Sequence, residues 1–286
     1  MQSWADSLRR HWPEYLMEAA GLGIFMVSAA VVTTLFEYPK SPLHGVLPDP
    51  AFRRVLVGIA MGLTAIGIIY SPWGKQSGAH LNPAVTLTFF RLRKMEGIDA
   101  LCYAIAQSVG GVIGLVLASV TIGMAIEHPA VNYVVTVPGN NGLGIAFLAE
   151  ALISFGLMLT VLLVSNHKAL APVTGIFAGC LVATYISLEA PFSGMSMNPA
   201  RTFASALPAD VWTAFWVYLA APPLGMLLAA ELYSRVKGLK QVYCAKLHHH
   251  NNKRCIFRCN YAALAASDNS PPSSPLPESE TFRPPL

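Results

Sequence analysis

The sequence has few charged side chains. Only 12% of its 286 residues are Asp, Glu, Lys or Arg, whereas soluble domains carry about 25%. Disorder over the whole chain is excluded, because 54% of the residues are hydrophobic and disorder requires low hydrophobicity. A net charge of +4 without a single basic face argues against nucleic-acid binding. Because the composition argues against a soluble domain, a disordered chain and a nucleic-acid-binding protein, the sequence predicts an integral membrane protein.

Cysteine is also scarce. The chain has five cysteines, an odd number without the spacing of a secreted disulfide framework, so no such framework is expected. The apolar part contains no nucleophile–base pair, phosphate-binding loop or metal motif. The sequence therefore predicts a protein that is not an enzyme and needs no cofactor.

Six apolar stretches are long enough to cross the roughly 30 Å hydrocarbon core as helices. They cover approximately residues 15–36, 55–69, 100–126, 142–165, 169–188 and 211–233. The predicted fold class is an all-α membrane protein. Most of the 19 Lys and Arg residues fall on the side that holds both termini, which predicts cytoplasmic termini in an inner or plasma membrane.

Two further apolar segments, at residues 77–90 and 193–207, are too short to span. Each contains Ser-Gly, then an Asn-Pro-Ala box, then about nine apolar residues. A nine-residue helix is about 13 Å long, under half of the hydrocarbon thickness. We therefore expect two re-entrant half-helices that end near the middle of the membrane.

The Asn-Pro-Ala boxes predict where these half-helices begin. Their residues are Asn82, Pro83 and Ala84 in the first segment and Asn198, Pro199 and Ala200 in the second. Asn is a good N-cap, and Pro is favoured at the first helical position. The non-helical backbone before each box is tolerated at membrane depth only where it lines a water-filled path or is buried in protein.

The chain also repeats itself. Glu18 opens the first span and Glu150 opens the fourth, each in an apolar context. Three spans and one half-helix occur at about residues 14–126 and again at about 142–235, between an N-terminal segment (1–13) and a tail (236–286). An odd number of spans inverts the second copy, and interrupted segments at matching positions of inverted halves indicate a transport site.

These features resemble the major intrinsic protein family, the aquaporins and glycerol facilitators. The resemblance rests on both boxes, the Ser77-Gly-Ala-His-Leu stretch, Arg201 and the two glutamates, and it covers roughly residues 14–235. It implies six tilted helices with two half-helices meeting at mid-membrane, and a homotetramer with one pore per subunit. It further implies a passive channel for water and small neutral solutes that excludes protons and ions.

The resemblance also implies roles for single residues. Asn82 and Asn198 would donate to the permeant at the pore centre, where two positive helix N-termini repel cations. Glu18 and Glu150 would accept N–H groups of the re-entrant loops, with a proton relay as the alternative. His80 would line or support the pore through its backbone carbonyl.

The family's outer constriction is formed by four side chains. They correspond here to Met61, Ile186, Met195 and Arg201. Water-selective members commonly have an aromatic residue and a His at the first two positions, and glycerol-selective members an Asp where this chain has Thr202. Arg with three flexible apolar side chains predicts a less strict filter, which passes water with glycerol, urea or hydrogen peroxide. The alternative for Arg201 is an ion pair with Glu189 or Asp210.

The tail contains candidate metal ligands. They are Cys244, His248, Cys255 and Cys259. Thiolate and imidazole are the ligands of zinc or another soft metal. The alternative is a solvated basic tail or a contact with anionic lipid. The Ser- and Pro-rich sequence from about residue 265 predicts disorder.

Two other functions remain open for the membrane part. An ion-coupled secondary transporter would need ionisable residues at the central site, where the sequence has Asn, Arg and small residues. A membrane scaffold of the same fold with a closed pore would fold without any flux.

Overall fold

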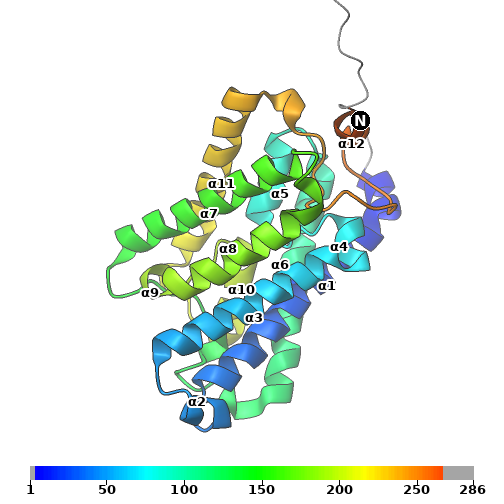
Figure 1. Cartoon of the computed structure of the whole chain (residues 1–286). Coiled ribbons are helices and arrows are strands. Elements are labelled where there is room, and N and C mark those ends of the chain that lie inside the picture. The colour runs from blue at the N-terminus through cyan, green and yellow to red at the C-terminus, as the bar shows by residue number, and fades with distance from the viewer. Residues whose placement is uncertain (1–3, 267–286) are drawn as a thin grey trace, which may run out of the picture.

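The computed structural model describes residues 4–266, and the sequence predicted to be disordered lies outside them beyond residue 266. All regular elements in this part are helices. Six are long and apolar enough to cross a membrane, which confirms the predicted all-α class (Figure 1). They are α1 (Trp4–Glu37), α3 (Pro50–Tyr70), α6 (Gly97–Ile122), α7 (Leu143–Ser165), α8 (Thr174–Leu188) and α11 (Phe215–Lys237). The span of α8 includes the 3₁₀ turn before it and so covers Ala171–Leu188.

The first span is longer than predicted. The apolar run begins near Tyr15, but α1 begins at Trp4. Its first turns are held by α6, because Tyr15 Oη donates to Asp99 Oδ1 (2.6 Å) and His11 Nδ1 lies 2.8 Å from the same oxygen. The apolar run marks the membrane-spanning part of the helix, and these polar contacts support its N-terminal extension.

The two short segments form half-helices as predicted. They are α5 (Pro83–Arg91) and α10 (Pro199–Ala209). Asn82 Oδ1 accepts the N–H of Ala84 (2.8 Å), and Asn198 Oδ1 accepts that of Ala200 (3.0 Å), so both predicted N-caps are confirmed.

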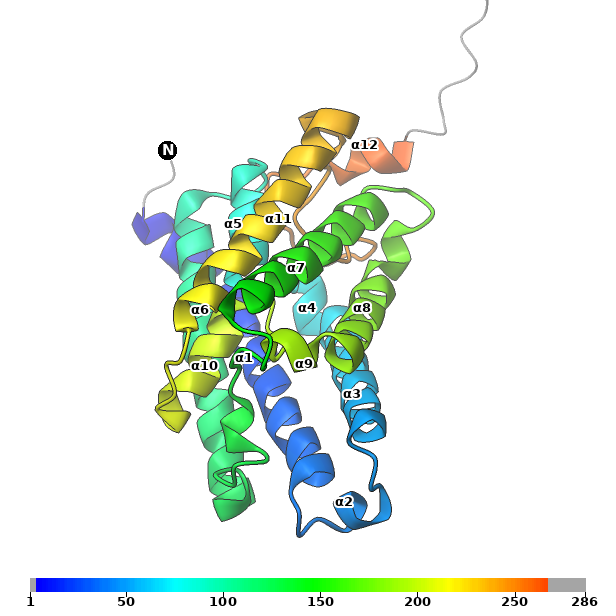
Figure 2. The ribbon, with the colours of Figure 1, turned by 90° about the vertical axis from the view of Figure 1, so that its left-hand side faces the viewer.

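Short helices connect the longer ones. The sequence patterns did not indicate α4 (Pro72–Ser77) and α9 (Ala190–Ser193), which lead into the two re-entrant loops. The other short elements are α2 (Pro42–Val46), α12 (Tyr261–Ala266), and single 3₁₀ turns at Gly123–Ala125, Asn132–Val134, Ala171–Val173 and Leu239–Gln241. The described beginning of α1 and α12 lie at one end of the molecule, called here the terminal side, and α2 lies at the opposite side (Figure 2).

The helices pair as expected for two inverted repeats. In the first repeat α1 packs against α6, and in the second α7 packs against α11, while α3 packs against α8 across the repeats. The half-helices are enclosed: α5 contacts α6 and α11, and α10 contacts the same two helices. This arrangement brings the N-terminal ends of α5 and α10 together inside the bundle, where the cap residues Asn82 and Asn198 each bond to the opposite loop.

Glycines allow the closest of these helix contacts. A Cβ atom on Gly110 of α6 would lie 2.1 Å from the carbonyl oxygen of Ala19 in α1, and one on Gly114 would lie 2.3 Å from that of Gly23. The backbones therefore touch directly, as small residues at helix interfaces in membranes allow.

We expect Gly110→Ala to destabilise the protein, because the added methyl group must push α1 and α6 apart at a cost of about 1–3 kcal/mol. Gly67→Ala, in the interior of α3, is the matched control, since its Cβ meets no atom within 4 Å and Ala is the better helix former. The measurement is the apparent unfolding temperature of the purified protein in detergent. Equal temperatures for the two variants would contradict the contact.

Candidate functional site

The first re-entrant loop is bound by a buried carboxylate. Glu18 is 0% exposed. Its Oε1 accepts Ser77 Oγ (2.7 Å) and the backbone N–H of His80 (3.1 Å), and its Oε2 accepts the backbone N–H of Leu81 (2.6 Å) and Gln107 Nε2 (2.8 Å). Both carboxylate oxygens thus face donors, three of them from the loop.

The second loop is bound in the same way. Glu150 is also 0% exposed, and it accepts Ser193 Oγ and the backbone N–H groups of Ser196 and Met197, each at 2.7 Å. Neither glutamate is among the residues that line the internal cavity. The contacts favour the expected acceptor role over a proton relay.

These bonds hold unusual backbone conformations. Ala79 and Leu81 have φ values of 54° and 51°, and Met195 and Met197 have 52° and 55°. Left-handed non-glycine residues cost of the order of 1–3 kcal/mol each and persist only where surrounding contacts impose them. The buried glutamates supply such contacts at matching positions of both loops.

The two Asn-Pro-Ala boxes are joined crosswise. Asn82 Nδ2 donates to the carbonyl of Met197 (2.7 Å), and Asn198 Nδ2 donates to that of Leu81 (2.7 Å). An amide NH₂ group has two N–H donors, so one N–H of each Asn remains after this bond. The N-terminal ends of two helices, each with a partial positive charge, meet at the same point.

One internal cavity of about 480 Å³ passes this point. Its lining includes His80, both box asparagines and all four predicted filter residues, Met61, Ile186, Met195 and Arg201. At one end it reaches Glu37 and Pro50 on the opposite side, and at the other end Leu247 of the tail. The structure therefore gathers residues from both repeats and from the tail around this cavity, which is called here the passage.

Arg201 is positioned by a residue that sequence reasoning missed. Its Nη1 donates to Thr136 Oγ1 (2.9 Å), and that hydroxyl lies 3.0 Å from Thr202 Oγ1. Within the described part, Arg201 forms no ion pair with Glu189 or Asp210. No motif marks Thr136, which lies in the irregular connection between α6 and α7.

His80 uses both ring nitrogens within the protein. Nε2 lies 2.8 Å from the carbonyl oxygen of Ala245 and therefore carries the proton, while Nδ1 lies 3.0 Å from Thr86 Oγ1. The ring stacks between Phe89 and Phe257, at centroid distances of 5.1 and 5.4 Å. These contacts favour a supporting role over acid–base chemistry.

The structure brings most of the candidate metal ligands together. Cys244, Cys255 and Cys259 form one group with His249. The predicted ligand His248 is not in this group: its ring lies 4.8 Å from that of Tyr70, edge to face. Adjacent side chains of an extended chain point to opposite sides, so only one of the two histidines can face the thiols.

The fold and the cavity define a membrane protein with an internal cavity that is lined from both repeats. The chain belongs to the major intrinsic protein family, whose family model matches residues 5–233.

Individual relatives agree with this assignment. Aquaporin NIP6-1 of Arabidopsis thaliana is 39% identical over 190 residues, 64% of this chain and 59% of that protein. Aquaporin NIP2-2 of Zea mays is 31% identical over 219 residues, 76% of this chain and 72% of that protein. The chain spans about three fifths of the length of several such relatives.

A solved structure shows the same fold. The X-ray structure of the aquaglyceroporin from Plasmodium falciparum matches with a TM-score of 0.68 at 22% identity, and the match covers 79% of this chain and 96% of that chain.

We expect Glu150→Gln to lower both the apparent unfolding temperature and the transport rate. Gln would turn an NH₂ group toward the loop's own donors, and a buried unsatisfied donor costs about 1–3 kcal/mol. The matched control is Glu127→Gln, because Glu127 is exposed. Unfolding in detergent and flux in vesicles are the measurements, and wild-type values for Glu150→Gln would contradict the anchoring role.

Proposed function

We propose that this chain is a passive channel for water and small neutral solutes such as glycerol, urea and hydrogen peroxide, and that it excludes protons and ions. The observation that carries the proposal is the crosswise pairing of Asn82 and Asn198 with the opposite loops, beside a cavity lined from both repeats. Family membership and relatives named aquaporins support it.

The geometry favours neutral permeants. A water molecule that leaves its neighbouring waters on entering the passage can accept hydrogen bonds from the remaining N–H groups of Asn82 and Asn198. A cation would meet the positive N-terminal ends of α5 and α10 and then the guanidinium of Arg201, and so would be repelled. Three of the four filter side chains are apolar, so the filter provides few partners that discriminate between small neutral molecules.

The alternatives have less support. An ion-coupled transporter would need ionisable groups beside the asparagines. Near the asparagines, the ionisable residues in the described cavity lining are His80 and Arg201, and both ring nitrogens of His80 are bonded within the protein. Glu37 and Arg54 also line the cavity but lie toward the opposite side. A closed scaffold would not need a lined passage.

We also propose cytoplasmic termini, a location in the inner or plasma membrane, and a homotetramer. The concentration of Lys and Arg on the terminal side supports the orientation. Large apolar side chains such as Leu63 (62% exposed) and Ile113 (53% exposed) cover the outer faces, where lipid or neighbouring subunits would contact them. The mass of the detergent-solubilised protein, measured by multi-angle light scattering, tests the assembly.

Proteoliposomes test the proposed function directly. We expect fast shrinkage in an impermeant sucrose gradient and fast re-swelling in glycerol or urea, both followed by stopped-flow light scattering. The rates should not saturate and should not depend on an ion gradient. Rates equal to those of empty vesicles, with the protein folded, would indicate the scaffold, and a saturable ion-driven flux would indicate the transporter.

The filter assignment predicts a change in selectivity. Met61→Phe with Ile186→His adds bulk and a hydrogen-bonding group to the passage, so we expect the glycerol-to-water rate ratio to fall by about tenfold, equivalent to 1.4 kcal/mol of barrier. Leu63→Phe with Ile176→His is the matched control, since these residues of the same helices are 62% and 45% exposed. An unchanged ratio in the first variant would contradict the assignment.

A further inference from the structure

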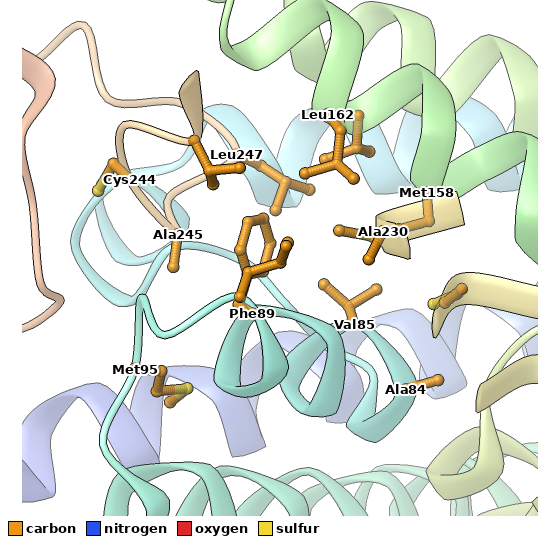
Figure 3. Close-up of a cluster of buried hydrophobic side chains, with 14 of the residues drawn as sticks. Ala84, Val85, Phe89, Met95, Met158, Leu162, Ala230, Cys244, Ala245 and Leu247 are labelled. Atoms are coloured by element: carbon orange, nitrogen blue, oxygen red, sulfur yellow. The ribbon is translucent and has the colours of Figure 1, made fainter. Parts of the chain in front are cut away.

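The tail returns to the terminal side of the passage. The tail segment, defined here as residues 242–259, buries Val242, Ala245 and Phe257 in the same apolar cluster as Phe89 of α5. Figure 3 shows Ala245 and Leu247 beside Phe89. Leu247 is among the residues that line the cavity. The tail segment is therefore part of the wall of the passage on this side.

Polar contacts fix the tail segment to the first re-entrant loop. The Leu247 N–H donates to the carbonyl oxygen of Gly78 (3.1 Å), and the Ala245 carbonyl accepts from His80 (2.8 Å). The ring of Phe257 fills the space beside Gly78, where a Cβ would lie 2.9 Å from it. Whatever holds the tail segment in shape therefore also supports the loop before Asn82.

Four side chains converge at the base of this segment. The ligand atoms of Cys244, His249, Cys255 and Cys259 all lie within 4.8 Å of one another. The Sγ atoms of Cys244 and Cys255 are 3.6 Å apart, and Cys259 Sγ is 3.1 Å from His249 Nε2. A tetrahedral zinc ion with Zn–S bonds of about 2.3 Å separates neighbouring sulfur atoms by about 3.8 Å. The cluster thus has the ligand types and nearly the spacing of such a site.

We propose that Cys244, His249, Cys255 and Cys259 bind one soft divalent cation of the zinc type, which fastens the tail segment against the re-entrant loop at the mouth of the passage. Three Cys and one His form a common closed ligand set of structural zinc sites. Binding displaces the thiol protons, since the thiolate is the metal ligand.

The surroundings suit this site. A divalent cation with three thiolates and a neutral imidazole carries a net charge of −1, and a positive charge lies nearby, because the ammonium group of Lys246 donates to the carbonyl of Arg254, the residue before Cys255 (2.7 Å). The backbone N–H of Tyr261 points to Cys259 Sγ (3.5 Å), and the Tyr261 ring stacks on His249 at 4.3 Å. Such outer contacts orient metal ligands.

Metal binding to the full-length protein tests the proposal. The protein is purified in detergent with a thiol-free reductant and without a polyhistidine tag, stripped with a chelator, and titrated with Zn²⁺ or Co²⁺ alone. We expect about one equivalent per chain and, with Co²⁺, thiolate charge-transfer and tetrahedral absorption bands. Absence of stoichiometric binding, or recovery of Cys244 and Cys255 as a disulfide under these conditions, would overturn the proposal.

Neighbouring histidines provide matched variants. His249→Ala should weaken binding by at least about a hundredfold, because loss of an outer contact alone costs up to that factor. His248→Ala and His250→Ala should bind like the wild type, as should Cys180→Ser in α8. Size-exclusion profiles in detergent establish that each variant is folded. Wild-type affinity in folded His249→Ala would refute the ligand assignment.

Proteolysis measures the fastening itself, independently of any flux. Lys246 is only 2% exposed, and its Nζ donates to the carbonyls of Lys253 and Arg254. We expect trypsin to cut at Lys246 several-fold faster after chelation, and Zn²⁺ to restore protection in the wild type but not in His249→Ala. Equal cleavage rates with and without Zn²⁺ would show that the metal does not hold the tail segment.

Discussion

The structure depends on a requirement that membranes impose on irregular backbone. Each non-helical N–H group that is buried in the protein at membrane depth needs an acceptor, because neither lipid nor the helix ladder provides one. Glu18 in α1 and Glu150 in α7 meet this need. With these carboxylates in place, the loops can leave helical geometry, reach the middle of the bundle and start a new helix there.

The same requirement explains why the two halves support each other. Once a loop is held, its carbonyls face the other half, and Leu81 and Met197 each accept from the asparagine of the opposite box. The asparagine at the beginning of each half-helix is therefore hydrogen-bonded to the loop of the other repeat. The duplication thus gives one central site that neither repeat would form alone, and the passage lies beside it.

The tail adds a contribution that belongs to neither repeat. Its apolar residues share a cluster with α5, and its backbone binds the loop before the first box. His80 is the meeting point: it is held by Thr86 in its own repeat and by Ala245 in the tail. The first loop is consequently supported from two sides, whereas Ser196, at the matching position of the second loop, is linked by its hydroxyl group to Asn198 and Thr202 within the same segment.

The amino-acid sequence by itself determined the six spans, the two half-helices and their caps, because length, hydropathy and capping depend on residues near one another in the chain. It also indicated inversion of the repeats, since the number of spans in each is odd. Only the tertiary structure decided that α1 extends to Trp4, that Thr136 holds Arg201 and that His249 rather than His248 faces the thiols. These are contacts between distant segments or choices of side-chain direction, and no local pattern encodes which segment the folded chain brings near.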